Sequence, residues 1–198
     1  MTAPTDPPAP RPPASTGRLR AAWRAAHAPA AGVPRWARIA ALAVPLVVLP
    51  SGLWRLPIAF GYDHGMGAEA GIGERVYIVL LSIVSELLAF TAVGLVASWG
   101  ERFPRWIPVL GGRNVPPMAA VVPASLGAAV LTVLWTHAFI GQLEGRTLQG
   151  GRLPANFPSE QGAVEAAIFY LAYTPLLLWG PLLAAVTFAY HRRRRAAR

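Results

Sequence analysis

Four ionisable residues lie within or beside the long apolar segments of this chain: Arg55, Glu86, His137 and Glu165. A charged side chain at the centre of a bilayer costs about 2.5 kcal/mol or more unless it is paired or neutralised. Glu86 and His137 could exchange protons or hold a ligand in a polar cavity open to the outside. Alternatively, the four residues have structural roles, which we favour. Arg55 then pairs with Glu86 or extends outward, while His137 bonds a neighbouring hydroxyl or carbonyl and Glu165 is solvated. We predict that the four form an intramembrane polar cluster between mid-membrane and the outer surface.

The sequence carries no motif for catalysis, metal binding or cofactor binding. It has no Cys, which excludes disulfides, thiolate metal sites and Cys nucleophiles. A bis-His haem would need two His within the membrane, and only His137 lies there. The close His/Glu spacing of zinc sites, the G-x-S-x-G elbow and a phosphate loop do not occur. We therefore predict no catalytic residue, no metal and no cofactor.

The elements that must position these residues are apolar segments of membrane-spanning length. Of the 198 residues, 54% are hydrophobic and 14% are charged, against roughly 25% charged in a soluble domain. An α-helix needs about 20 apolar residues to cross the hydrocarbon core. The sequence therefore predicts an all-α membrane protein with four transmembrane helices, at about residues 38–60, 75–99, 117–142 and 163–190.

The parts of the chain outside and between these helices differ in composition. Residues 1–34 are rich in Pro, Ala and Arg, and we predict a disordered cytoplasmic tail. Residues 35–191 form the transmembrane domain, and residues 192–198 a basic cytoplasmic tail. Pro175 and Pro181 should bend the fourth helix, because proline lacks a backbone N–H.

Small and polar residues at helical spacing predict which helix faces touch, since apolar matching drives no association in lipid. The second helix has such a stripe at Ser82, Ser85, Glu86, Ala89 and Val93. The third has one at Ala120, Ala124 and Ala128. We predict that these stripes are inner surfaces of the helix bundle.

The distribution of arginine gives the protein a direction in the membrane. All 18 basic residues are Arg, and 14 of them lie before the first helix, between the second and third, or after the fourth. The positive-inside rule therefore places both termini in the cytoplasm. Because topology explains the net charge of +9, we predict no nucleic-acid binding. The wealth of Arg, Ala, Gly and Pro suggests a GC-rich bacterial genome, hence a bacterial plasma membrane.

The most distinctive segment is the cytoplasmic loop WGERFPRWIPVLGGRNVPP, residues 99–117. Its Trp side chains suit the headgroup region and its Arg side chains the anionic inner leaflet. We predict an interfacial hinge that fixes helix depth, with docking of a cytoplasmic partner as the alternative. The residues concerned are Trp99, Glu101, Arg102, Arg105, Trp106 and Arg113.

This loop resembles a segment of uncharacterised multi-span membrane proteins of actinobacteria. The shared pattern is W-G-E, P-R-W-x-P and G-G-R-x-V-P, matched here by Trp99–Glu101, Pro104–Trp106 with Pro108, and Gly111–Arg113 with Val115 and Pro116. The likeness covers about a sixth of the chain. It implies a bacterial plasma-membrane setting and carries no activity.

Three functions remain open. The one we favour is a non-enzymatic integral membrane protein that binds a partner protein or a second copy of itself, or organises the envelope. The second is a small proton-coupled transporter that uses Glu86. The third is a membrane enzyme that acts on a lipid or quinone through His137, Glu86 or Glu165.

Overall fold

The structure is a computed structural model, and it describes residue 17 and residues 30–65, 67, 71–101, 112 and 114–196. Most of these residues are helical. An isolated antiparallel bridge joins Arg146 and Arg152 in the loop after α4. The helical elements, with η marking a 3-10 helix, are α2 (Arg35–Ala59), α3 (Ile72–Gly94), η1 (Ser98–Glu101), α4 (Pro117–Leu143), α5 (Ala163–Tyr173), η2 (Thr174–Leu178) and α6 (Trp179–Ala196).

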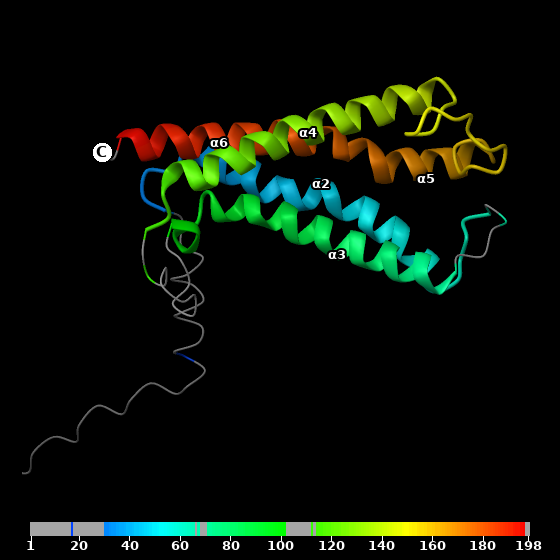
Figure 1. The fold of residues 1–198 in the computed structure, drawn as a ribbon, viewed down its shortest axis with the longest axis horizontal. Coiled ribbons are helices and arrows are strands. Elements are labelled where there is room, and N and C mark those ends of the chain that lie inside the picture. Colours follow the sequence, from blue (N-terminus) through cyan, green and yellow to red (C-terminus); the bar gives the residue numbers. More distant parts are fainter. Residues whose placement is uncertain are drawn as a thin grey trace, which may run out of the picture.

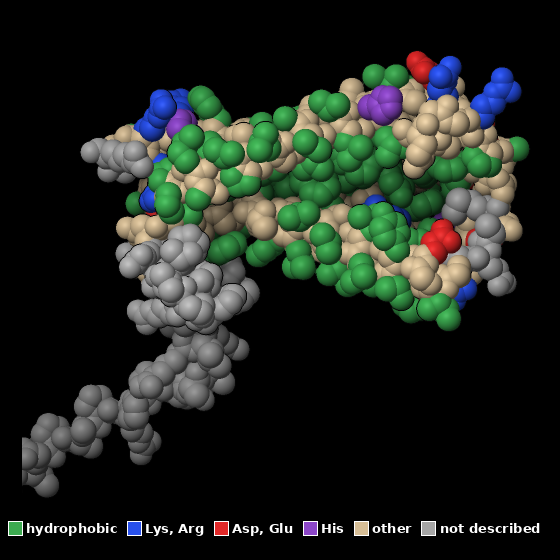
Figure 2. Space-filling view, in the orientation of Figure 1, with side chains coloured by type: hydrophobic (Ala, Val, Ile, Leu, Met, Phe, Trp, Pro, Cys, Tyr) green, Lys and Arg blue, Asp and Glu red, His purple; other side chains and the backbone are tan. Residues whose placement is uncertain are grey.

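The helices form an open arc (Figure 1). α3 packs chiefly on α2, α2 on α6, and α6 on α4. α3 and α4 therefore lie at the two ends of the arc, and a recess lined by hydrophobic side chains separates them (Figure 2). Along the helix axes, we call the end with Arg35 and Ala196 the terminal end, and the end with residues 60–65 and 144–162 the loop end.

Four segments are long and apolar enough to cross a membrane: Arg35–Ala59, Ile72–Gly94, Pro117–Leu143 and Ala163–Ala196. Large apolar side chains cover their outer faces, and Ile39, Leu126 and Val133 are 63–69% exposed. Such surfaces are unfavourable in water and match the hydrocarbon of a bilayer. The chain is therefore an all-α integral membrane protein with four membrane-spanning helices, as the sequence predicts.

Small buried side chains hold the arc together. Near the terminal end, Ala37 and Ala41 of α2 pack with Val186 and Tyr190 of α6. The predicted stripe on α3 is confirmed as an inner surface at Ser82, Ala89 and Val93, which are buried, whereas Ser85 and Glu86 are half-buried. On α4, Ala128 is buried, and Ala120 and Ala124 pack against the terminal-end cluster.

The contact between α4 and α6 depends on a glycine. A Cβ atom at Gly180 would lie 2.6 Å from the backbone nitrogen of Thr132 and 2.7 Å from the carbonyl oxygen of Ala128. No side chain fits there without separating the two helices. Close backbone approach at small residues is how transmembrane helices gain packing energy in lipid.

The fourth span changes direction at a 3-10 segment. Pro175 lies in the first turn of η2, between α5 and α6, where its missing N–H interrupts the α-helical hydrogen bonds. Beyond this break, α5 diverges from α4 towards the loop end (Figure 1). The predicted bend at Pro175 is thus confirmed. Pro181 lies in the first turn of α6, where a missing N–H costs little.

Two predicted tails are partly built into the fold. Residues 30–34 were expected in a disordered segment, yet Ala30 is buried and its N–H donates to the Val96 carbonyl at 2.9 Å. Residues 1–16 and 18–29 of the predicted tail lie outside the described residues. At the other terminus, α6 continues to Ala196, so most of the expected basic tail is helical.

Candidate functional site

Arg55 and Glu86 lie at different depths in the membrane. Arg55 is four residues from the end of α2 at Ala59, and Glu86 is fourteen residues from the start of α3 at Ile72. At about 1.5 Å per residue, they lie about 6 Å and about 21 Å below the loop end. The separation along the helix axes is therefore about 15 Å. The ion pairs found among the described residues do not join them.

Glu86 lies deep in the bilayer part of α3. It is eight residues, or about 12 Å, from the terminal end of the helix at Gly94. The side chain is half-buried at the edge of the stripe that packs on α2. Within the described chain, no hydrogen bond or ion pair involves its carboxyl group. The described residues therefore give this acid no polar partner.

His137 and Glu165 are exposed and do not join a common site with the other two. His137 lies six residues before the end of α4 at Leu143, and the imidazole is exposed on the outer surface of the helix. Glu165 lies in the first turn of α5. Its Oε2 lies 2.7 Å from the position that a Cβ of Gly162 would occupy. The carboxylate thus folds back over the N-terminus of α5, where it interacts favourably with the helix dipole.

Arg55 is held within the protein near the loop end. One guanidinium nitrogen, Nη2, lies 3.5 Å from the Ser51 hydroxyl, which donates to the Val48 carbonyl at 2.8 Å. The Nε atom is buried and has no hydrogen-bond partner. Arg55 directly follows Trp54, whose ring makes an edge contact with Tyr173 of α5. Arg55 therefore lies near the aromatic residues at the loop end.

An aromatic cluster at the loop end was missed by sequence reasoning. The His64 ring stacks on Trp54 with centroids 4.1 Å apart, and His64 Nε2 lies 2.8 Å from the Trp54 carbonyl oxygen. Trp54 in turn makes edge contacts with Phe169 and Tyr173 at 5.6 and 5.4 Å. His64 adopts a positive φ of 51°. The first residues after α2 are therefore held on that helix.

The second loop at this end joins the same cluster. Gln161 Nε2 donates to the His64 carbonyl oxygen at 2.9 Å, which connects the two loops. Phe157 makes an edge contact with Phe169 at 5.3 Å. The segment between α4 and α5 is thus packed on the helices. The only sequence signal for this order is the concentration of aromatic residues near the ends of the predicted helices.

A cavity of about 330 Å³ lies where α4 and α5 diverge. Its walls are aromatic, from Trp135 and Phe139 on α4 and from Phe169, Tyr170 and Tyr173 on α5. Loop residues Arg146–Gln149, Leu153 and Phe157 also line it. We call it the loop-end cavity. The break at η2 is its cause, because a straight fourth helix would continue along α4.

A polar depression beside this cavity carries both signs of charge. Arg146 lines the loop-end cavity and also this depression, which Glu144, Arg152 and Glu160 line as well. Arg146 Nε lies 3.9 Å from Glu144 Oε2, with both side chains more than 60% exposed. The charges of the two arginines and the two glutamates balance. The depression therefore favours hydrogen bonding and does not attract one sign of charge.

The predicted cytoplasmic loop is described only at its edges. Trp99 and Glu101 are described, whereas Arg102, Arg105, Trp106 and Arg113 lie outside the described residues. Trp99 packs against Gly94 and stacks on Phe90 with centroids 6.3 Å apart. Glu101 forms a 2.7 Å ion pair with Arg193 of α6, whose side chain is only 11% exposed.

Arg193 and Arg194 fasten the end of α6 to three other segments. The Arg193 guanidinium also donates to the carbonyl oxygens of Ala31 and Leu95 at 3.3 and 3.4 Å. Arg194 donates to the Val115 carbonyl, just before α4, at 2.8 Å. We call these contacts, with the Glu101 ion pair, the arginine clamp. The sequence predicts a basic cytoplasmic tail here, yet two of its arginines make structural contacts.

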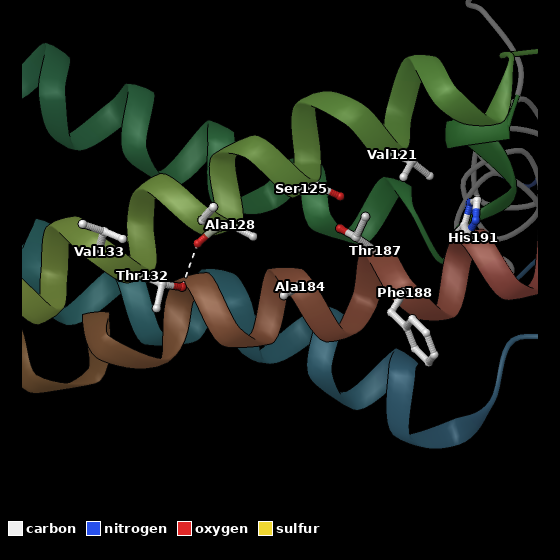
Figure 3. Close-up of a pocket in the computed structure, with 10 residues that line it drawn as sticks. Val121, Ser125, Ala128, Thr132, Val133, Ala184, Thr187, Phe188 and His191 are labelled. Carbon is white, nitrogen blue, oxygen red and sulfur yellow. Dashed lines mark hydrogen bonds between the residues drawn. The ribbon is translucent and has the colours of Figure 1, made fainter.

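A second cavity, of about 500 Å³, lies between α4 and α6 (Figure 3). Its walls include small side chains at Ser125, Ala129 and Ala184, all exposed on the outer surface. The Ser125 and Thr187 hydroxyls point towards the space between the helices. Such a depression of small residues permits close approach of another helix.

Metal chemistry has no support in the described part of the chain, which contains no group of three His, Cys, Asp or Glu side chains placed to hold an ion.

No protein-family model, curated protein or solved structure matches this sequence. The likeness of the residue 99–117 loop to actinobacterial proteins therefore stays a prediction.

Proposed function

We propose that this protein is a non-enzymatic membrane protein that binds a partner protein within the bilayer. The observation that carries the proposal is Glu86, an acid deep in α3 without an ion pair or hydrogen bond in the described structure. A carboxyl group at this depth costs about 2.5 kcal/mol or more if it stays charged and unpaired. A donor on another transmembrane helix would relieve that cost.

The open arc of helices supports the same proposal. α3 is an end helix of the open arc, so the side of α3 away from α2 has no neighbour within the described chain. Leu87 and Leu88, beside Glu86, are 62% and 58% exposed. A partner helix can therefore lie along α3 and reach Glu86 at the edge of the α2 contact.

The two alternatives have less support. A proton-coupled transporter needs a water path to its acid, and Glu86 lines neither the loop-end cavity nor the α4–α6 cavity. A membrane enzyme that uses His137, Glu86 or Glu165 gains support where two of them lie close enough to act together. Two of these are exposed near the loop end, and Glu86 lies about 21 Å below that end.

The setting of this function is also a proposal. We infer that the terminal end faces the cytoplasm of a bacterium and that the membrane is the plasma membrane. The support for the orientation is the arginine distribution, because Arg192–Arg195 lie in the last turns of α6 and the segment between α3 and α4 also carries arginine. The support for a bacterial membrane is the wealth of Arg, Ala, Gly and Pro.

Photo-crosslinking in living cells tests partner binding. A benzophenone amino acid at Leu87 should give a discrete protein adduct, because this exposed side chain adjoins Glu86 on α3. Glu86→Ala should lower the adduct yield about three- to tenfold, since a polar contact between helices in lipid contributes roughly 0.6–1.5 kcal/mol. Glu86→Gln should keep most of the yield, because an amide still accepts a hydrogen bond.

Two controls sharpen the result. Glu74→Gln changes an exposed acid at the loop end of the same helix and should leave the yield unchanged. The same probe at Val133, an exposed position on α4, reports background adducts. An adduct of twice the chain mass identifies a second copy as the partner. Lipid adducts alone at Leu87, with the protein folded, would overturn the proposal.

A further inference from the structure

The loop-end cavity has the features of a ligand site, and its use does not depend on Glu86. Its volume of about 330 Å³ falls in the range of small-molecule pockets, roughly 300–1,000 Å³. It lies between the loop ends of α4 and α5 and beneath residues 146–157. A molecule bound there would lie at the boundary between hydrocarbon and water.

The walls favour a flat ring. Phe139 and Tyr170 contact each other at 6.3 Å, Phe169 and Tyr170 at 5.6 Å, and Phe169 stacks on Tyr173 at 4.7 Å. These mutual contacts fix the rings before any ligand arrives. Aromatic pairs gain about 0.5–1.5 kcal/mol beyond their buried area, so a ring-bearing ligand gains more here than an acyl chain.

The polar groups of the wall favour an uncharged ligand with hydrogen-bond acceptors. Gln142 Nε2 donates to Ser159 Oγ at 2.6 Å, which fixes the amide and leaves its second N–H available. The Tyr170 hydroxyl has no hydrogen-bond partner among the described residues and can donate. In the polar depression beside the cavity, the charges of Arg146 and Arg152 are balanced by those of Glu144 and Glu160. An anionic headgroup would gain no net attraction there.

We propose that the loop-end cavity binds a lipid-soluble, uncharged molecule with a flat ring that carries carbonyl acceptors, the chemistry of a quinone head. The ring lies against Phe139 and Tyr170. The carbonyl oxygens accept hydrogen bonds from Tyr170 and Gln142. The apolar tail leaves between α4 and α5 into the lipid. The proposal is one of binding and includes no redox step.

Ligand binding to the purified full chain in nanodiscs tests this site. The probes are a decyl-substituted benzoquinone, dioleoylglycerol as an uncharged lipid without a ring, and dioleoylphosphatidylglycerol as an anionic lipid. Native mass spectrometry should show a one-to-one adduct with the quinone that survives competition from either lipid. The quinone should also raise the apparent melting temperature as its concentration increases.

Substitutions separate the features of the site. Ala138→Phe fills the cavity from α4 and should weaken quinone binding at least tenfold. Ala119→Phe adds the same ring at an exposed position of the same helix and should leave affinity unchanged. Tyr170→Phe should weaken binding about three- to tenfold through loss of one hydrogen bond. Phe139→Leu, which keeps an apolar wall, should weaken it by a similar factor.

Each other outcome overturns part of the proposal. Equal binding of dioleoylglycerol would contradict a ring-specific site. Preference for dioleoylphosphatidylglycerol would contradict an uncharged ligand. Quinone binding that Ala138→Phe leaves intact, in a variant that melts like the parent protein, would place the ligand elsewhere. Absence of all three adducts would refute a lipid-soluble ligand.

Discussion

Single residues at the terminal end show how a charge run can serve the fold. Arg193 is largely buried and bonds to Glu101, Ala31 and Leu95. Arg192 and Arg195, on the same helix, are exposed. Neighbouring arginines of identical chemistry therefore have different roles, because α6 turns 100° per residue and only one side of it faces α2 and η1.

Removal of Arg193 should destabilise the protein. Arg193→Ala leaves Glu101 and two backbone carbonyl oxygens without their donor, and we expect a loss of about 1–3 kcal/mol of unfolding free energy. Arg195→Ala removes the same charge at an exposed position and should cost less than about 0.5 kcal/mol. Denaturant unfolding in detergent micelles measures both. Equal losses for the two variants would refute a structural role for the clamp.

The depth of a single side chain in the membrane decides which other side chains it can reach. The sequence offers pairing of Arg55 with Glu86 as one structural explanation of the two charges. Counting at about 1.5 Å per residue from the loop end of the observed helices gives an axial gap of about 15 Å. The same count from the predicted spans, 38–60 and 75–99, gives only about 9 Å, because α3 begins three residues earlier and α2 ends one residue earlier than predicted. The observed helix boundaries were therefore needed to separate the two residues.

At the scale of elements, α4 and α6 approach each other closely because Gly180 has no side chain. Gly180→Ala should destabilise the protein by about 1–3 kcal/mol, because its new methyl group would overlap Thr132 and the Ala128 carbonyl. The measurement is the unfolding free energy in detergent or bicelles.

Gly127 offers the matched control in the same pair of helices. A Cβ at Gly127 would meet only Leu183 Cδ2, at an ordinary contact distance of 3.9 Å. Gly127→Ala should be neutral or stabilising, because alanine favours helix by up to about 1 kcal/mol over glycine. If Gly180→Ala proved as harmless as Gly127→Ala, the close crossing would not limit stability.

The elements were largely predictable from sequence, and their neighbours were not. Runs of apolar residues gave the spans to within a few residues, and Pro175 gave the break, since both depend on local chemistry. Which helices touch depends on shape, because lipid offers no preference among apolar faces. The arginine clamp escaped prediction for another reason. Most of its acceptors are backbone carbonyl oxygens, which every residue possesses.

At the scale of the whole molecule, the terminal end and the loop end differ in chemistry. The terminal end carries the arginine clamp, and the loop end carries the aromatic cluster and its cavity. The difference follows the predicted orientation, in which arginine remains on the cytoplasmic side. Measuring which end faces the cytoplasm therefore tests the predicted orientation.

Cysteine labelling measures the orientation without background, because the chain has no cysteine. We expect Ala155→Cys, exposed at the loop end, to react with an impermeant maleimide on intact bacterial spheroplasts. Ala196→Cys, exposed at the terminal end, should react only after permeabilisation. The reverse pattern would invert the topology, and labelling of both in intact spheroplasts would refute a single orientation.

The order of helices in the arc has a consequence for biogenesis. α4 packs chiefly on α6 and η2, and the clamp that joins the terminal end resides on α6. Ribosomes make α6 after α4, so α4 enters the membrane before its main packing partner exists. Until α6 is released into the membrane, α4 is therefore surrounded by lipids or insertion machinery.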